Sequence, residues 1–138
     1  MFQSRGEVRQ VYLDVWQKMQ TNSLLEPMEA IIADIIQMHP EYHSFMEKSE
    51  HAREKDFLPE DGETNPFLHM GMHIALREQA NTDRPVGFKD IYQKLLRKHA
   101  QHDAEHAMME CLAEALYYSQ KDNLPFDEIA YMGQLKAL

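Results

Sequence analysis

The sequence predicts an all-α fold, a compact bundle of five or six helices that forms a single domain over residues 1–138. Three observations predict it. Every apolar segment repeats at the spacing of a helix. Proline stands where helices are expected to begin, at Pro27, Pro66 and Pro125. The length of 138 residues suits one domain with a single sizeable core.

The N-terminal part of the chain predicts two helices followed by a kink. Residues 7–20 repeat apolar side chains at helical spacing, and "TNS" ends this helix. A second helix begins at Pro27, and its apolar arc extends as far as His39, which therefore occupies a core position. Pro40 interrupts the pattern, so "HPEYHSFMEK" is expected to restart as a kinked turn of helix carrying His43.

A long polar loop is expected at about residues 49–65, with a turn signal at Asp61–Gly62. Loops of this length are mobile or functional, and this one joins two segments that carry histidines. We therefore expect it to cover or border a histidine cluster. Asn65 then caps a third helix over about 66–80, with Leu68 on its inward face and its histidines at the edge of that face.

The C-terminal half predicts one long helical pattern and one short helix. Helical spacing persists from about Phe88 to Gln120, which would span about 50 Å if straight. That exceeds the diameter of a small domain, so we expect a bend or break near 97–103. A final helix is expected to begin at Pro125 and to direct Ile129 inward.

Charge and composition exclude several classes of partner. The net charge is −9, with 23 acidic against 14 basic residues, so neither nucleic acid nor an anionic membrane surface is an expected partner. Cys111 is the only cysteine, which excludes an intramolecular disulfide. The first residues lack the apolar stretch of a signal peptide, and no segment is apolar enough to span a bilayer. These features favour a cytoplasmic protein, and they leave its oligomeric state open.

The eight histidines are spaced unusually. Three pairs stand four residues apart, whereas random placement of eight histidines would give about 0.45 such pairs. Residues four apart lie on one side of a helix, so two imidazoles of a pair can reach the same cation. The pairs are His39/His43, His69/His73 and His102/His106.

Helical bundles build metal sites by bringing such pairs together from facing helices. The favoured ligands are His69, His73, His102 and His106, with His43 and Glu110 completing or gating the site. Imidazole suits a divalent metal such as Zn, Fe or Ni, and the sequence does not choose among them. Neutral imidazole is required, so metal should be lost as pH falls through about 6. Nearby carboxylates, Glu105 among them, are expected to hold the second nitrogens of the rings.

Two functional readings stay open. In the first, a metal lowers the pKa of a bound water and supports hydrolysis or group transfer on a small-molecule substrate. In the second, the protein is a non-catalytic structural or protein-interaction module, its histidines are packed core residues, and methionine-rich faces dock a protein partner. Cys111 is expected to be a small buried hydrophobe, and Arg77 to form a surface salt bridge.

Three motifs carry a family resemblance. "HPEYH", "PEDGETNPFLHMGMH" and "HDAEHAMMECLAE" together resemble a bacterial family of unknown function, and the likeness covers nearly the whole chain. That family implies no activity. The chain also resembles, more loosely, helical bundles of the DinB type, in which three histidines, two of them four apart, bind one divalent metal. The hemerythrin pairing His-x-x-x-Glu occurs only at His106/Glu110, and the other spacings of that family do not match.

Overall fold

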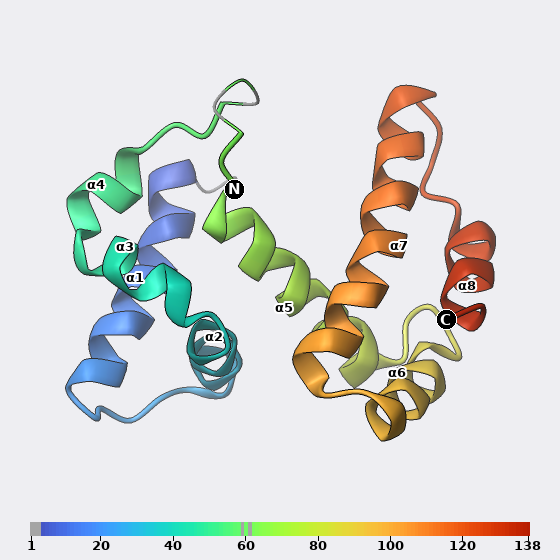
Figure 1. The fold of residues 1–138 in the computed structure, drawn as a ribbon, viewed down its shortest axis with the longest axis horizontal. Helices are drawn as coiled ribbons and strands as arrows, with labels where there is room; N and C mark the ends of the chain where they lie inside the picture. The colour runs from blue at the N-terminus through green and yellow to red at the C-terminus, as the bar shows by residue number, and fades with distance from the viewer. Residues whose placement is uncertain (1–3, 59, 61) are drawn as a thin grey trace. The chain divides into compact units, whose positions relative to one another are not determined.

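A computed structural model describes residues 4–58, 60 and 62–138, and within them the chain forms eight α-helices, one short 3-10 helix and no strand (Figure 1). The predicted all-α class is confirmed. None of these helices is long and apolar enough to cross a membrane. The elements are α1 (Arg5–Gln20), α2 (Pro27–Gln37), η1 (Pro40–Tyr42), α3 (His43–Glu47), α4 (Ser49–Glu54), α5 (Pro66–Thr82), α6 (Phe88–Lys98), α7 (Gln101–Lys121) and α8 (Glu128–Lys136).

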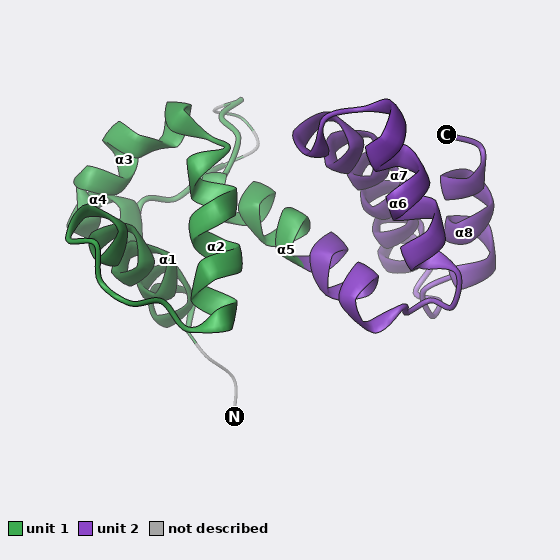
Figure 2. Cartoon of the chain, turned by 90° about the horizontal axis from the view of Figure 1, so that it is seen from below, with its two compact units in different colours: residues 1–74 green, residues 75–138 purple. Residues whose placement is uncertain are grey.

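The chain divides into two compact units, residues 1–74 and 75–138 (Figure 2). In unit 1, α1 contacts both α2 and α4. In unit 2, α6, α7 and α8 all contact one another. The boundary falls inside α5, so one continuous helix belongs to both units. The single bundle over residues 1–138 that the sequence predicts stays a prediction, and the two units are described separately.

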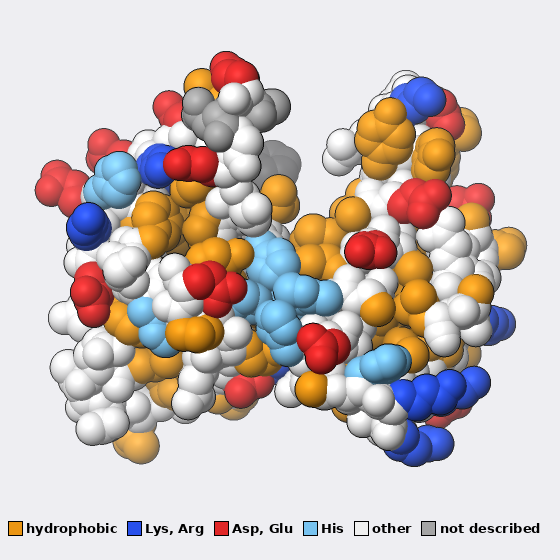
Figure 3. Space-filling model, viewed as in Figure 1, with side chains coloured by type: hydrophobic (Ala, Val, Ile, Leu, Met, Phe, Trp, Pro, Cys, Tyr) orange, Lys and Arg blue, Asp and Glu red, His pale blue; other side chains and the backbone are white. Residues whose placement is uncertain are grey.

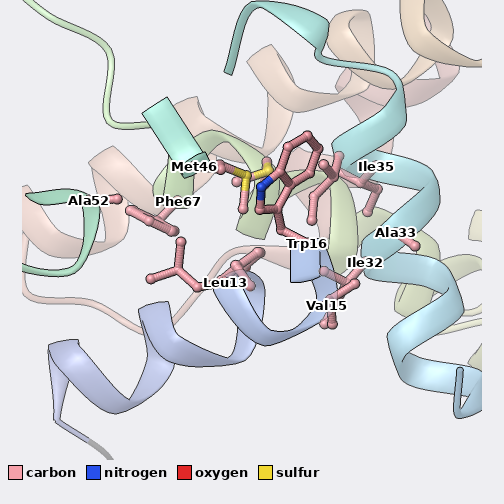
Figure 4. Close-up of a cluster of buried hydrophobic side chains, with 12 residues drawn as sticks. Leu13, Val15, Trp16, Ile32, Ala33, Ile35, Met46, Ala52 and Phe67 are labelled. Atoms are coloured by element: carbon pink, nitrogen blue, oxygen red, sulfur yellow. The ribbon is translucent and has the colours of Figure 1, made fainter. Parts of the chain in front are cut away.

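The core of unit 1 gathers around Trp16, whose ring is surrounded by aliphatic side chains from α2 and α3 (Figure 4). Val15, Ile35 and Met46 in this core are almost completely buried. Ser4 caps α1, because its side chain accepts a hydrogen bond from the backbone N–H of Glu7.

Helix α4 corrects the prediction of a polar loop over 49–65, because Ser49–Glu54 is helical. Six residues are too few to show apolar periodicity, and the helix is held by a residue distant in sequence. The buried Arg9 guanidinium donates from Nη1 to the carbonyl oxygens of Ala52, Arg53 and Lys55, at 3.2, 3.2 and 2.7 Å. The remaining connection, residues 55–65, includes Pro59 and Asp61, which lie outside the described residues.

The described residues form eight α-helices, more than the five or six that the sequence predicts. Pro40 does break the chain as expected, and η1 and α3 follow it as two short helices. The predicted break near 97–103 is confirmed at His99, which is extended at φ −135° and ψ 155°. The short helices α3 and α4 therefore account for most of the difference.

Helices α5 and α8 correct two predictions about inward faces. Asn65 caps α5 as expected, accepting from the N–H groups of Phe67 and Leu68 at 3.0 and 3.3 Å. Leu68, however, is 65% exposed. The helix α8 begins at Glu128 rather than at Pro125, because Asp127 provides its cap. Ile129 consequently points outward and is 88% exposed.

Candidate metal centre

Three histidines of unit 1 converge, and the local sequence explains the position of each. His39 directly follows the last turn of α2, and Pro40 prevents that helix from continuing. His69 and His73 lie on α5, whose start is fixed by the Asn65 cap and Pro66. Their spacing of four places both imidazoles on one side of α5.

The three Nε2 atoms lie at distances that suit a shared cation. Nε2 of His69 is 3.2 Å from Nε2 of His39 and 3.3 Å from Nε2 of His73. The ring nitrogens offered by the three residues all lie within 4.8 Å of one another. Two nitrogens bound at 2.0–2.1 Å to a tetrahedral zinc stand about 3.3–3.4 Å apart. The existing spacing therefore needs little adjustment to hold an ion.

The tautomer of His39 is fixed by the backbone. Its Nδ1 lies 2.7 Å from the carbonyl oxygen of Ile35, and a carbonyl oxygen can only accept, so Nδ1 carries the proton. Nε2 of the neutral ring then carries a lone pair, and this nitrogen lies 3.2 Å from Nε2 of His69. The ring also stacks on Tyr42 at a centroid distance of 5.2 Å, which holds its plane. Metal-ligating histidines are oriented by this kind of second hydrogen bond.

Burial distinguishes this cluster from surface histidines. His39 and His73 are 1% and 0% exposed, while His69 is partly exposed. Two Nε2 atoms in direct contact can be joined either by one N–H···N hydrogen bond or by a cation between them. We call His39, His69 and His73 the histidine triad.

The predicted ligands divide into three groups. His69 and His73 belong to the triad. His43 does not, because its Nε2 donates to the carbonyl oxygen of Ile36 at 2.9 Å and its ring packs on Trp16. This bond gives His43 a structural role at the end of α2.

The remaining predicted ligands lie on α7 in unit 2. The rings of His102 and His106 are adjacent, with centroids 4.0 Å apart, and Nδ1 of His102 is 3.7 Å from Oδ1 of Asp103. Glu110 lies on an exposed part of the same helix. That His102 and His106 share a cation with His69 and His73 stays a prediction.

His39 is the triad member that spacing did not select as a ligand. The interpretation paired it with His43 and placed it in the core, and its burial confirms the core position. Pro40 ends the helix between the two residues, so they do not share a helix face. The usable signal was the position of His39 on the inward arc of α2, immediately before a proline.

Unit 2 has a buried polar network of its own. Arg77 forms an ion pair with Glu105, Nε to Oε2, at 3.0 Å, and the hydroxyl of Tyr92 donates to the same Oε2 at 2.5 Å. The predicted surface salt bridge of Arg77 is therefore buried. Burial, reinforced by the hydrogen bond to Glu105, raises the pKa of Tyr92 to about 12, although a hydrogen bond from Gln101 opposes the rise.

Cys111 is buried in unit 2, as the sequence predicts. Burial raises the pKa of its thiol, and the charges of Glu114 and Glu110 add to the rise. A thiol that resists ionisation is a poor nucleophile, so a packing role fits this residue best.

A comparison with protein families gives one match. The family model described as a domain of unknown function, DUF1841, matches residues 4–137. No curated protein and no solved structure matches the chain.

Proposed function

Since the chain belongs to the DUF1841 family, whose description states no activity, we propose its function from the geometry of unit 1. The protein binds one divalent cation, zinc in the first instance, through Nε2 of His39, His69 and His73. The observation that carries the proposal is the pair of Nε2–Nε2 separations, 3.2 and 3.3 Å. Imidazole also accepts iron and nickel, so the ligand set alone does not choose the metal.

The number of ligands determines what the metal would do. Three imidazoles leave one tetrahedral position for water, as in catalytic zinc sites, and the metal lowers the pKa of that water to about 7. The expected chemistry is hydrolysis or group transfer. If His102 and His106 also bind the metal, no coordination position remains for water and the site is structural. The three-histidine site is our proposal because its members are held together within one unit.

The metal content of the purified protein tests whether the triad binds a cation. Untagged protein, purified without a nickel column, is expected to bind about one zinc per chain with at least micromolar affinity. His73→Ala removes a triad ligand and should abolish this binding. His51→Ala is the matched control, since His51 is exposed on α4 and lies against Phe45, outside the triad. Equal zinc binding by both variants would refute the site.

The double variant His102→Ala/His106→Ala tests the number of ligands. With a three-histidine site it keeps its zinc, and with a shared site the zinc is lost. Hydrolysis of p-nitrophenyl acetate then probes for a zinc-activated water. We expect the zinc-loaded protein to hydrolyse this ester faster than the metal-free protein, and His73→Ala to remove the difference.

One surface favours the alternative function, an interaction module. Large apolar side chains are exposed where α7 ends and α8 begins in unit 2, and orange side chains are visible at that end of α7 in Figure 3. Beside them lies a pocket of about 210 Å³ with three carboxylates on its walls. This pattern fits a partner segment with an apolar anchor and basic residues. The exposed residues are Leu116, Tyr117, Tyr118, Leu124 and Ile129, and the carboxylates are Glu114, Asp122 and Asp127.

Met46, Met70, Met108 and Met109 are buried, whereas Met28 is 46% exposed, so the docking of a partner on methionine-rich faces stays a prediction. A peptide library of basic and apolar sequences tests the alternative directly. Specific binding that Tyr118→Ala abolishes, in a protein that binds no zinc, would favour it over the metal site.

A further inference from the structure

Unit 1 has an open pocket of about 410 Å³ directly beside the triad. His69 lies on its wall, and it is also the triad member whose Nε2 contacts both other Nε2 atoms. The loop after α4 supplies Phe57 and Leu58 to the same wall, so the prediction that this loop borders the histidine cluster is confirmed for these residues. The pocket and the triad thus share a residue.

The lining of the pocket is mainly apolar, and it faces solvent. Leu58 and Leu68 are 48% and 65% exposed, and Met72 lies one turn after Leu68 on α5. The sequence predicts that Leu68 faces the core, but its exposure leaves apolar surface in water, and covering that surface is favourable. Apolar side chains gathered around an open hollow indicate a binding site.

The acidic charge on the described part of the pocket wall is paired with a lysine. Glu63 is the acidic residue of the lining, and its Oε2 is 2.8 Å from Nζ of Lys55. That ammonium also lies 5.2 Å from the centre of the Phe57 ring. Among the described residues of the wall, the charge of Glu63 is thus paired with Lys55, so these residues suit an uncharged apolar group.

We propose that this pocket binds the apolar part, an alkyl or aryl group, of a small-molecule substrate whose polar group meets the cation at the triad. The inference rests on the proposed metal site and names its substrate class. His69 links the two parts, because a molecule lying against its ring in the pocket is next to the metal held by its Nε2. Substrates with an uncharged apolar tail are then preferred over small polar ones.

Hydroxamic acids test the proposal, since they chelate zinc through one end and carry a variable tail at the other. Zinc-loaded protein is titrated with acetohydroxamic acid and with octanohydroxamic acid. We expect the octanoyl compound to bind at least tenfold tighter. In Leu68→Gln or Met72→Gln that preference should fall to about threefold or less, with zinc content unchanged.

Leu24→Gln is the matched control, because Leu24 is an exposed leucine of unit 1 that does not line this pocket. It should keep the full preference. Equal affinity of the two compounds for zinc-loaded protein would overturn the pocket while leaving the metal site intact. Failure of the wild-type protein to bind zinc would overturn the metal site and the pocket together. A preference that survives in both Leu68→Gln and Met72→Gln would place the tail elsewhere.

Discussion

His39 donates its Nδ1–H to the carbonyl oxygen of Ile35, one helical turn earlier, at 2.7 Å. The bond belongs to the last turn of α2, where carbonyl groups have no intrahelical partner. One hydrogen bond therefore satisfies a helix end and fixes the tautomer of a buried imidazole. The nitrogen of His39 that the proposed metal site uses is thus set by the fold itself, which would lower the cost of organising that site.

His39→Gln and His43→Gln are a matched pair of variants that tests this relationship. His39→Gln should weaken zinc binding at least a hundredfold, because a triad ligand is lost. His43→Gln should change the zinc affinity less than threefold, because the hydrogen bond of His43 goes to Ile36 instead. Competition with a chromogenic zinc chelator measures both. A larger loss of zinc affinity in His43→Gln than in His39→Gln would show that His43 is a ligand and His39 is not.

Zinc binding should depend on pH through the triad. Each imidazole must be neutral to bind, so protons compete with the metal as pH falls. Zinc should be retained at pH 7–8 and released as pH falls through about 6, with uptake of more than one proton per ion. Equilibrium dialysis at several pH values measures the release. An affinity that is flat between pH 5 and 8 would contradict binding by these side chains.

Part of the site could be predicted because its signals are local. Asn65 and Pro66 mark the start of α5, and the spacing of His69 and His73 places them on one side of it. The spacing does not predict His39 as a ligand, because its contact with His69 depends on how the chain folds after Pro40. Residues that meet from separate helices have no fixed spacing along the sequence, so spacing alone cannot identify them.

The differences between the predicted and the observed helices have a similar cause. Helix α4 has no periodic signal, and it is held by Arg9, which is more than forty residues earlier in the chain. Leu68 fits the pattern of an inward residue, yet it is 65% exposed and lines the pocket of unit 1. Apolar periodicity identifies a helix more reliably than it identifies the face that the core covers.

Arg9→Met tests the attachment of α4. The variant removes the donor to three carbonyl oxygens, and it should lower the free energy of unfolding of unit 1 by about 2–3 kcal/mol. Urea denaturation followed by the fluorescence of Trp16 reports on this unit, because Trp16 is the only tryptophan and lies in its core. Arg53→Met, which loses one bond to Gln10, is the control and should lose less than about 1 kcal/mol. Equal losses would mean that Arg9 does not stabilise α4.

Tyr92→Phe tests the buried network of unit 2 at neutral and at alkaline pH. The variant keeps the ring and removes the hydroxyl that donates to Glu105, so at pH 7 it should be less stable by about 2 kcal/mol. The pKa of Tyr92 is raised to about 12 in the folded protein, chiefly by burial, against about 10 in an unfolded chain. Between those values the unfolded state loses its proton first.

The stabilisation from Tyr92 is therefore fully present below pH 10 and is lost as pH rises through 12. Stability measured by urea unfolding and circular dichroism should fall more steeply with pH in the wild-type protein than in Tyr92→Phe over this interval. The difference in tyrosinate absorbance between the two proteins, recorded while both stay folded, should show one group that titrates near pH 12. A group that titrates near pH 10 would show that the hydroxyl of Tyr92 is neither buried nor bound to Glu105.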